Sequence, residues 1–112
     1  MNSSSIKFKN DSYKRSRGGY SRLLDIQCAK CGNHLFLYQK DGPGILKRMY
    51  LDRIYKSDKY SDLDKNILSE IPNLICDECK SVLGVPYVYE KEKRMAYRLF
   101  VGSVSKKIIK SK

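Results

Sequence analysis

Cys28-Ala29-Lys30-Cys31 is matched in form by Cys76-Asp77-Glu78-Cys79, and these two stretches contain all four cysteines of the 112-residue chain. Two residues between cysteines let a tight turn direct both sulfurs at one metal ion, while backbone N–H groups of the turn can donate to the thiolates. Two such turns, separated by 44 residues, supply the four soft ligands of a tetrahedral Zn²⁺ site. The pattern therefore predicts one structural zinc ion. Its predicted ligands are Cys28, Cys31, Cys76 and Cys79.

The same cysteines admit other interpretations. Iron can occupy a site of four sulfurs, and the spacing does not distinguish iron from zinc. Two disulfides would require an oxidising compartment, and residues 1–22 lack the apolar segment of a secretory signal. A redox-active dithiol needs one C-x-x-C at the start of a helix, not two matched pairs. We therefore expect thiolate ligands in a reducing, cytoplasmic compartment.

The formal net charge of +11 is concentrated at the two ends of the chain. Residues 1–23 carry six Lys or Arg and one Asp, and residues 103–112 carry four Lys and no acidic residue. Such basic tails favour a polyanionic partner such as nucleic acid, or an anionic membrane surface. Alternatively, they only increase solubility. No apolar run reaches membrane-spanning length. Of the two anionic partners we expect nucleic acid, and no membrane.

Residues 1–22, called the leader below, are expected to be disordered. Their small, polar and cationic side chains cannot bury enough apolar surface to offset the entropy lost on ordering. Ser12 to Arg22 interleaves cations, glycines and tyrosines, which can stack on unpaired bases and contact phosphates. A flexible leader that contacts nothing is the alternative. We expect the folded domain to span 23–102, with a basic tail at 103–112.

Hydrophobic patterns predict a mostly β fold, a small antiparallel domain of zinc-ribbon-like type. Strands are predicted at 23–27, 33–38, 82–89 and 95–101. Pro86 indicates an edge position or a bulge in the third of these strands. Residues 40–44, Lys-Asp-Gly-Pro-Gly, form a loop by their turn residues and lack the GK[ST] ending of a P-loop.

Two segments between the cysteine pairs are harder to assign. Residues 45–56 place several apolar side chains on one face of a helix, but their composition also suits a half-buried strand. Asp62 is expected to cap one short helix that continues through Glu70 and ends before Pro72. The residues of this helix expected to point inward are Leu63, Ile67 and Leu68.

The surroundings of the cysteines resemble the Yippee-like proteins over residues 24–102. The residues that carry the resemblance are Cys28, Ala29, Cys31, His34, Leu35, Cys76, Cys79, Lys80, Ser81, Leu83, Gly84 and Tyr87. The resemblance implies the β-tent fold, which these proteins share with the thalidomide-binding domain of cereblon and the methionine-R-sulfoxide reductases. In that fold two antiparallel sheets meet at an angle and a Cys₄ zinc joins them near one end. It also implies a strand over Leu46–Ile54.

No catalytic group stands out in the sequence. A reductase of the β-tent kind would need a nucleophilic cysteine outside the metal site, and the chain has no fifth cysteine. His34, the only histidine, could be a general base or an alternative metal ligand. We expect it instead to be a hydrogen-bonding residue near the complete four-sulfur site. The sequence thus predicts a protein that is not an enzyme.

The leading hypothesis is a non-catalytic zinc domain that binds RNA or a ribonucleoprotein, such as a ribosome-associated protein. The expected nucleic-acid contacts are Lys14, Arg15, Arg17, Tyr20, Arg22, Lys40, Lys47, Arg48, Arg53, Lys106, Lys107 and Lys110. The alternative is a protein-interaction adaptor, which the resemblance to the Yippee-like family implies. A small-molecule sensor with a pocket beside the sheets is a third hypothesis with less support.

Overall fold

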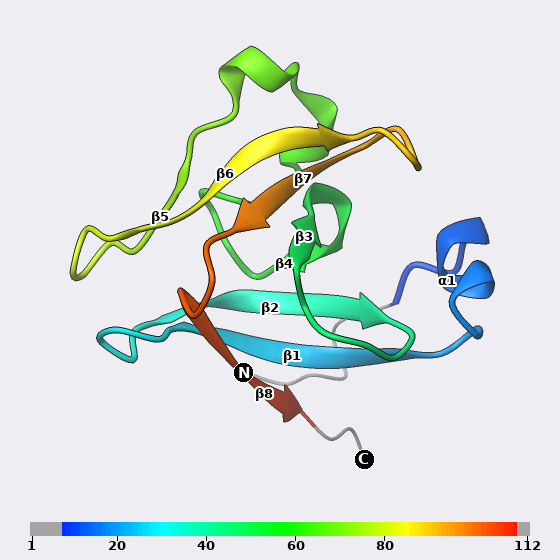
Figure 1. The fold of residues 1–112 in the computed structure, drawn as a ribbon, viewed down its shortest axis with the longest axis horizontal. Coiled ribbons are helices and arrows are strands. Elements are labelled where there is room, and N and C mark those ends of the chain that lie inside the picture. The colour runs from blue at the N-terminus through cyan, green and yellow to red at the C-terminus, as the bar shows by residue number, and fades with distance from the viewer. Residues whose placement is uncertain (1–7, 110–112) are drawn as a thin grey trace.

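Two four-stranded antiparallel sheets form the molecule, one above the other in Figure 1. The computed structural model describes residues 8–109. As predicted, the fold is mostly β. Its one α-helix among the described residues is the short α1 (Ser12–Ser16), which lies outside the segment predicted to be helical. No helix within the described range is long and apolar enough to cross a membrane.

We call the lower sheet of Figure 1 sheet A and the upper one sheet B. Sheet A has the strand order β4-β2-β1-β8, with β4 Ile54–Tyr55, β2 His34–Asp41, β1 Ser21–Cys28 and β8 Val104–Ile109. Sheet B has the order β3-β7-β6-β5, with β3 Arg48–Tyr50, β7 Arg94–Leu99, β6 Val82–Tyr89 and β5 Leu74–Ile75. β5 pairs with β6 only at Val82 and Gly84, so Pro86 lies where β6 has one partner strand, as expected for an edge position.

The hydrophobic core lies between the sheets. Alternate residues of β1 and β2, including Leu24, Ile26 and Phe36, point into it, as the two-residue period of a strand requires. Tyr60 joins the layers because its ring packs edge-on against Phe36 and Tyr97, with centroids 6.0 Å away in each case. The Tyr60 hydroxyl also accepts a hydrogen bond from the N–H of Ile75, which fixes the approach to the second cysteine turn.

Residues 45–56 form neither one helix nor the single strand that the resemblance implies. β3 belongs to sheet B and β4 to sheet A, and a 3₁₀ turn at Leu51–Arg53 connects them. The side chains of Leu51 and Arg53 are fully buried in this turn. The strand is interrupted because the chain crosses here from one sheet to the other.

The prediction of one helix at 62–70 is wrong. Two separate 3₁₀ turns, Leu63–Lys65 and Leu68–Glu70, take its place. Asp62 has a left-handed backbone (φ 63°) and makes no capping hydrogen bond, whereas an N-cap needs an extended backbone. Ile67 is 64% exposed rather than inward-facing.

The leader is ordered from residue 8 onward, so the prediction of disorder is wrong for residues 8–22. Asp11 caps α1 by accepting a hydrogen bond from the N–H of Lys14, and β1 begins at Ser21 rather than at residue 23. Residues 1–7 lie outside the described part. The error arises because the leader is held by ion pairs, which hydrophobic patterning does not detect.

A charge network around two buried arginines, Arg53 and Arg94, holds the leader against the domain. The Arg53 guanidinium is fully buried and contacts three carboxylates, those of Asp11 (2.7 Å), Asp41 (3.0 Å) and Asp52 (3.2 Å). The Arg94 guanidinium lies between two aromatic rings, with its central carbon 4.0 Å from the Tyr13 centroid and 3.7 Å from that of Tyr50. A further ion pair joins Arg17 to Glu92 at 2.6 Å.

The basic tail also differs from the prediction, since Val104–Ile109 forms the strand β8. It pairs with β1 from Leu23 opposite Ile109 to Cys28 opposite Val104. The folded unit therefore extends beyond residue 102. Lys110, the last predicted nucleic-acid contact, lies outside the described residues.

Candidate metal centre and cationic surface

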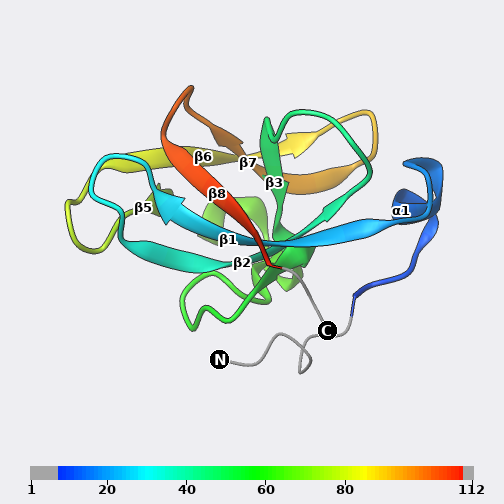
Figure 2. The same ribbon diagram turned by 90° about the horizontal axis from the view of Figure 1, so that it is seen from below.

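The two cysteine turns lie side by side at one end of the molecule. The turn between β1 and β2 and the turn between β5 and β6 both project at the left in Figures 1 and 2. One turn comes from each sheet, so a metal ion held between them would link the two layers. The fold thus brings Cys28 and Cys31 to Cys76 and Cys79, as the spacing predicts.

The four sulfur atoms form a compact cluster in which each lies within 4.8 Å of the others. The Sγ atoms of Cys28 and Cys79 are 3.6 Å apart, and those of Cys31 and Cys76 are 3.5 Å apart. A tetrahedral ion with Zn–S bonds of about 2.3 Å requires S···S edges of about 3.8 Å. All four cysteines are free. Their arrangement can therefore hold one metal ion, and no disulfide competes for the sulfurs.

Both turns use the same backbone geometry. In each, the first cysteine donates its N–H to the carbonyl five residues later and accepts a hydrogen bond from the N–H four residues later. The bonds are Cys28 to Asn33 (2.9 Å), Gly32 to Cys28 (2.8 Å), Cys76 to Ser81 (3.0 Å) and Lys80 to Cys76 (2.8 Å). The residue after the second cysteine is left-handed in both turns, with φ 79° at Gly32 and φ 63° at Lys80.

Polar groups around the sulfurs favour the thiolate form at one side of the cluster. Hydrogen bonds from the side chain and backbone of Ser81 lower the pKa of Cys79 to about 6. At Cys31 a backbone hydrogen bond from Asn33 lowers the pKa, but desolvation and the neighbouring thiols outweigh it and raise the pKa to about 12. Four adjacent thiols cannot all ionise without a cation, so a divalent metal would replace the protons that they otherwise share.

His34 is not part of this cluster. Its Nδ1 lies 2.5 Å from a carboxylate oxygen of Asp25, on the neighbouring strand β1. The metal-ligand cluster found among residues 8–109 consists of the four cysteines alone. His34 is thus a hydrogen-bonding residue beside the site and makes no contact of its own with the sulfurs.

Cations gather at a second place, on the core-facing side of sheet A beyond the end of the core. Arg22 lies on the same face of β1 as Leu24 and Ile26, because side chains two residues apart point to the same side of a strand. It is directly opposite Lys40 on β2. Lys106 lies opposite Ile26 on the other side of β1 and therefore shares this face. We call Arg22, Lys40 and Lys106 the cationic triplet. Burial lowers the pKa of Lys40, and Arg22, Lys106 and Arg17 lower it further.

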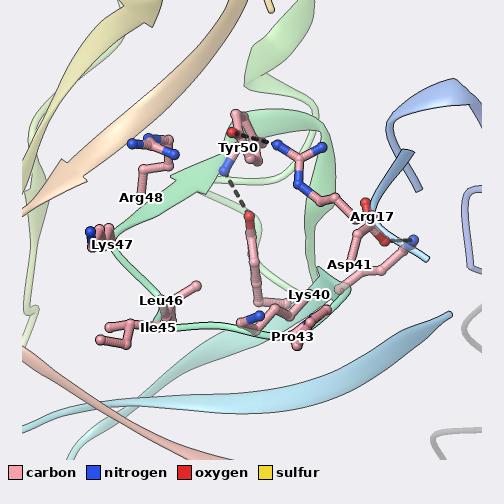
Figure 3. Close-up of a pocket in the computed structure, with 11 residues that line it drawn as sticks. Arg17, Lys40, Asp41, Pro43, Ile45, Leu46, Lys47, Arg48 and Tyr50 are labelled. Carbon is pink, nitrogen blue, oxygen red and sulfur yellow. Dashed lines mark hydrogen bonds between the residues drawn. The ribbon is translucent and has the colours of Figure 1, made fainter. Parts of the chain in front are cut away.

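Two pockets open beside the cationic triplet, and residues 45–48 line both of them. The smaller pocket, of about 180 Å³, is bounded by β2, the loop 42–46 and β3 (Figure 3). The larger, of about 740 Å³, lies between residues 45–48 and the connection from β7 to β8. Lys47 and Arg48 belong to both pockets, and Asp41 is the one carboxylate among the described residues that line them.

The structure brings together half of the predicted nucleic-acid contacts. Those at the triplet and the pockets are Arg17, Arg22, Lys40, Lys47, Arg48 and Lys106. Arg17 is also paired with Glu92. Lys14 and Arg15 belong to α1, and Lys107 lies on the outer face of β8 opposite Asp25. Tyr20 is exposed beside the guanidinium of Arg22.

The prediction that Arg53 contacts nucleic acid is wrong. Its side chain has no exposed surface and is occupied by three carboxylates, so it cannot contact RNA. The predicted nucleic-acid contacts did not include Arg98 or Tyr38, which line the pockets. Arg98 is exposed in β7 and lines the larger pocket, and Tyr38 lines the smaller one. The alternation of β7, which turns Tyr97 inward and Arg98 outward, contains the signal for Arg98.

Comparison of the chain with protein-family models, with curated proteins and with solved structures finds no match in any of the three. The resemblance to the Yippee-like proteins therefore stays a prediction. The features of the chain that bear on its function are the cysteine cluster, the cationic triplet and the two pockets.

Proposed function

We propose that the protein is a non-catalytic, zinc-stabilised β domain that binds RNA or a ribonucleoprotein. The observation that carries this proposal is the cationic triplet, where Arg22 and Lys40 lie directly opposite each other with Lys106 on the same face. Like charges in such positions repel and destabilise a sheet. A polyanion bound there would neutralise them.

Zinc is the metal that we propose for the cysteine cluster. Four thiolates with no open coordination position are typical of a structural Zn²⁺ site, and the matched turns from the two sheets suit a cross-linking role. Such ligands require a reducing compartment such as the cytoplasm. With all four sulfurs bound, no cysteine is left as a nucleophile, which supports a binding rather than a catalytic function.

The residues that line the larger pocket favour single-stranded RNA as the ligand, rather than a partner that is bound by charge alone. Its lining combines the cations Lys47, Arg48 and Arg98 with the aromatic rings of Tyr87 and Phe100. Phe100 is 49% exposed, so its ring is accessible to a ligand. Unpaired bases stack on aromatic side chains while the backbone phosphates contact cations, and both kinds of group occur here side by side.

The test measures binding of single-stranded RNA by fluorescence anisotropy at several salt concentrations. The double variant Arg22→Gln/Lys106→Gln removes two triplet charges outside the pockets. Each lost phosphate contact should reduce the slope of log K against log salt by about 0.7, so the slope should shrink by about 1.4. Lys65→Gln/Lys91→Gln removes the same charge from exposed positions elsewhere and should leave the slope close to that of the wild type.

Two results would contradict the proposal. One is an equal loss of affinity in the triplet variant and in the control, because only the net charge would then matter. The other is no binding of RNA below about 100 μM, where non-specific electrostatic binding is already expected.

A protein-interaction adaptor is the second candidate. It is favoured by the apolar side chains at the rim of the larger pocket, where Ile45 is 80% exposed and Val101 is fully exposed next to Phe100. Exposed apolar side chains that gather at a pocket are typical of contact surfaces for proteins. If the protein does not bind RNA, the adaptor function with this apolar contact surface is favoured.

A further inference from the structure

We infer that the smaller pocket is a binding site for a phosphate group. This inference deepens the proposed RNA binding, on which it rests, by naming the chemical group that the pocket recognises and the residues that hold it. The loop at 42–44 is not a P-loop, and the side chains around it would hold the phosphate instead (Figure 3).

Lys40 provides the central charge of the pocket. Figure 3 shows its side chain extending from β2 toward the middle of the pocket, with Lys47 at the rim. Among residues 8–109, the Lys40 ammonium donates one hydrogen bond, to the carbonyl of Gly42 at 2.8 Å. An ammonium group has three donors, so two remain for the oxygens of a bound anion.

The one carboxylate of the pocket, Asp41, offsets this charge only in part, because burial and the neighbouring cations have larger effects on the pKa of Lys40. One oxygen of Asp41 accepts from Ser21 at 2.6 Å, and the other accepts from the buried Arg53 at 3.0 Å. Arg22 and Lys106 approach Lys40 from the inner face of sheet A and help to lower its pKa. The surroundings of Lys40 thus disfavour its own charge, and an anion in the pocket would relieve the repulsion.

The Tyr38 hydroxyl is a second donor. Its side chain is 2% exposed and lines the pocket, and its oxygen accepts a hydrogen bond from the N–H of Tyr50 at 2.8 Å. Tyr38 donates no hydrogen bond to any residue among 8–109, so its O–H can point to a ligand. Burial raises the pKa of Tyr38, which keeps this proton in place at neutral pH.

The size of the pocket selects a small anion. Pockets that enclose a drug-sized ligand usually measure about 300–1,000 Å³, whereas this one measures about 180 Å³. A phosphate group fits, but a whole nucleotide does not. The remainder of a nucleotide would extend past residues 45–48 into the larger pocket, where Tyr87 and Phe100 offer rings for the base.

The test uses the metal-loaded, ¹⁵N-labelled full chain and inorganic phosphate as the probe. Backbone amide signals are followed during titration with sodium phosphate, against sodium chloride at equal ionic strength. We expect saturable shifts at Gly42, which accepts from Lys40, and at Tyr50, which donates to Tyr38. Lys40→Met should weaken phosphate binding at least tenfold, and Tyr38→Phe severalfold. Lys107→Met, on the outer face of β8, is the control and should not change it.

The same variants are then tested with a short RNA carrying either a 5′-phosphate or a 5′-hydroxyl group. Tighter binding of the 5′-phosphorylated form that is lost in Lys40→Met assigns a terminal phosphate to the pocket. Equal effects of Lys40→Met on both forms assign an internal phosphate. Saturation by inorganic phosphate without RNA binding would support the pocket, with a free phosphate compound as its ligand, and would contradict the proposed function.

The inference is overturned if phosphate produces no more shift than chloride. It is also overturned if Lys40→Met binds phosphate and RNA like the wild type while Arg22→Gln/Lys106→Gln loses RNA binding. In that second case RNA binding by the cationic surface would stand without the phosphate pocket.

Discussion

Arg22 and Lys40 lie directly opposite each other on adjacent strands, so two positive charges face the same side of sheet A. The outer face of the sheet is arranged differently, because Lys107 of β8 lies opposite Asp25 of β1. One face therefore pairs opposite charges across the strands, whereas the other face brings like charges together. The second arrangement costs stability and is consistent with a surface built for an anionic ligand.

This contrast predicts opposite effects of two similar substitutions. Lys40→Met should stabilise the protein by about 0.2–1 kcal/mol at low salt, because it removes the repulsion from Arg22. Lys107→Met should be neutral or slightly destabilising, since it removes an attraction to Asp25. Urea unfolding of the metal-loaded proteins measures both effects, and added salt should reduce them. A loss of stability in Lys40→Met would contradict the repulsion.

Metal binding is expected to be inseparable from folding. Cys79→Ser removes one of four ligands that join the two sheets, so the variant should lose the metal and most of its tertiary structure. Asp77→Asn, in the same turn, is the control. This variant should retain the metal and the tertiary structure, because the Asp77 side chain is exposed and its carboxylate contacts Lys59 rather than the cysteine cluster. Elemental analysis identifies zinc or iron. Less than about half an equivalent of metal in folded wild-type protein would contradict a structural site.

The matched cysteine turns predict a stabilising substitution. Lys80 adopts the same left-handed backbone as Gly32, but its side chain makes that conformation costly by about 1–2 kcal/mol. Lys80→Gly should therefore stabilise the metal-loaded protein by about 0.5–1 kcal/mol after the loss of chain entropy is subtracted. Gly32→Ala is the matched test in the other direction. A Cβ at Gly32 meets no atom within 4 Å, so its destabilisation would report the backbone alone.

Thermal unfolding of the wild type and the two variants, each with bound metal, gives the comparison. If Lys80→Gly and Gly32→Ala change stability in the same direction, the equivalence of the two turns does not extend to their energetics.

Deletion of residues 1–20 should destabilise the domain, contrary to the behaviour of a disordered leader. It removes Asp11 from the buried Arg53 and uncovers the Arg94 guanidinium by removing Tyr13. Because Asp41 and Asp52 still pair with Arg53, we expect a loss of about 1.5–3 kcal/mol, the range for a hydrogen bond to a charged group. Asp11→Asn in the full chain should cause part of this loss. Unchanged unfolding of the shortened chain would show that the leader contributes no stability.

The sequence allowed a correct prediction of those elements whose conformation depends on residues close together in the chain. The strand at Val82–Tyr89 has the predicted bounds, and the two cysteine turns form one cluster. β-branched and aromatic residues define such a strand by themselves, and the C-x-x-C spacing defines a turn in the same way. The mostly β fold follows from these elements.

The sequence did not predict features that depend on distant partners. Arg53 looks like a surface cation until Asp11 and Asp41, 42 and 12 residues away, are placed around it. β8 contains two consecutive lysines and reads as a tail, yet it is stabilised because β1 offers an open edge. The cationic triplet likewise needs the register of three strands, which periodicity within one segment does not supply.

The pairing of β1 with β8 has a mechanical consequence. Leu23 and Ile109 lie opposite each other, so a force that pulls the two ends of the chain apart acts across the end of an antiparallel pair. Once the leader is detached, such a force peels the strands open one hydrogen bond at a time instead of shearing many bonds together. The peeling front travels toward the last pair, Cys28 with Val104. There it meets one of the four clustered cysteines, so a metal ion held by that cluster would act as the anchor at which mechanical opening stops.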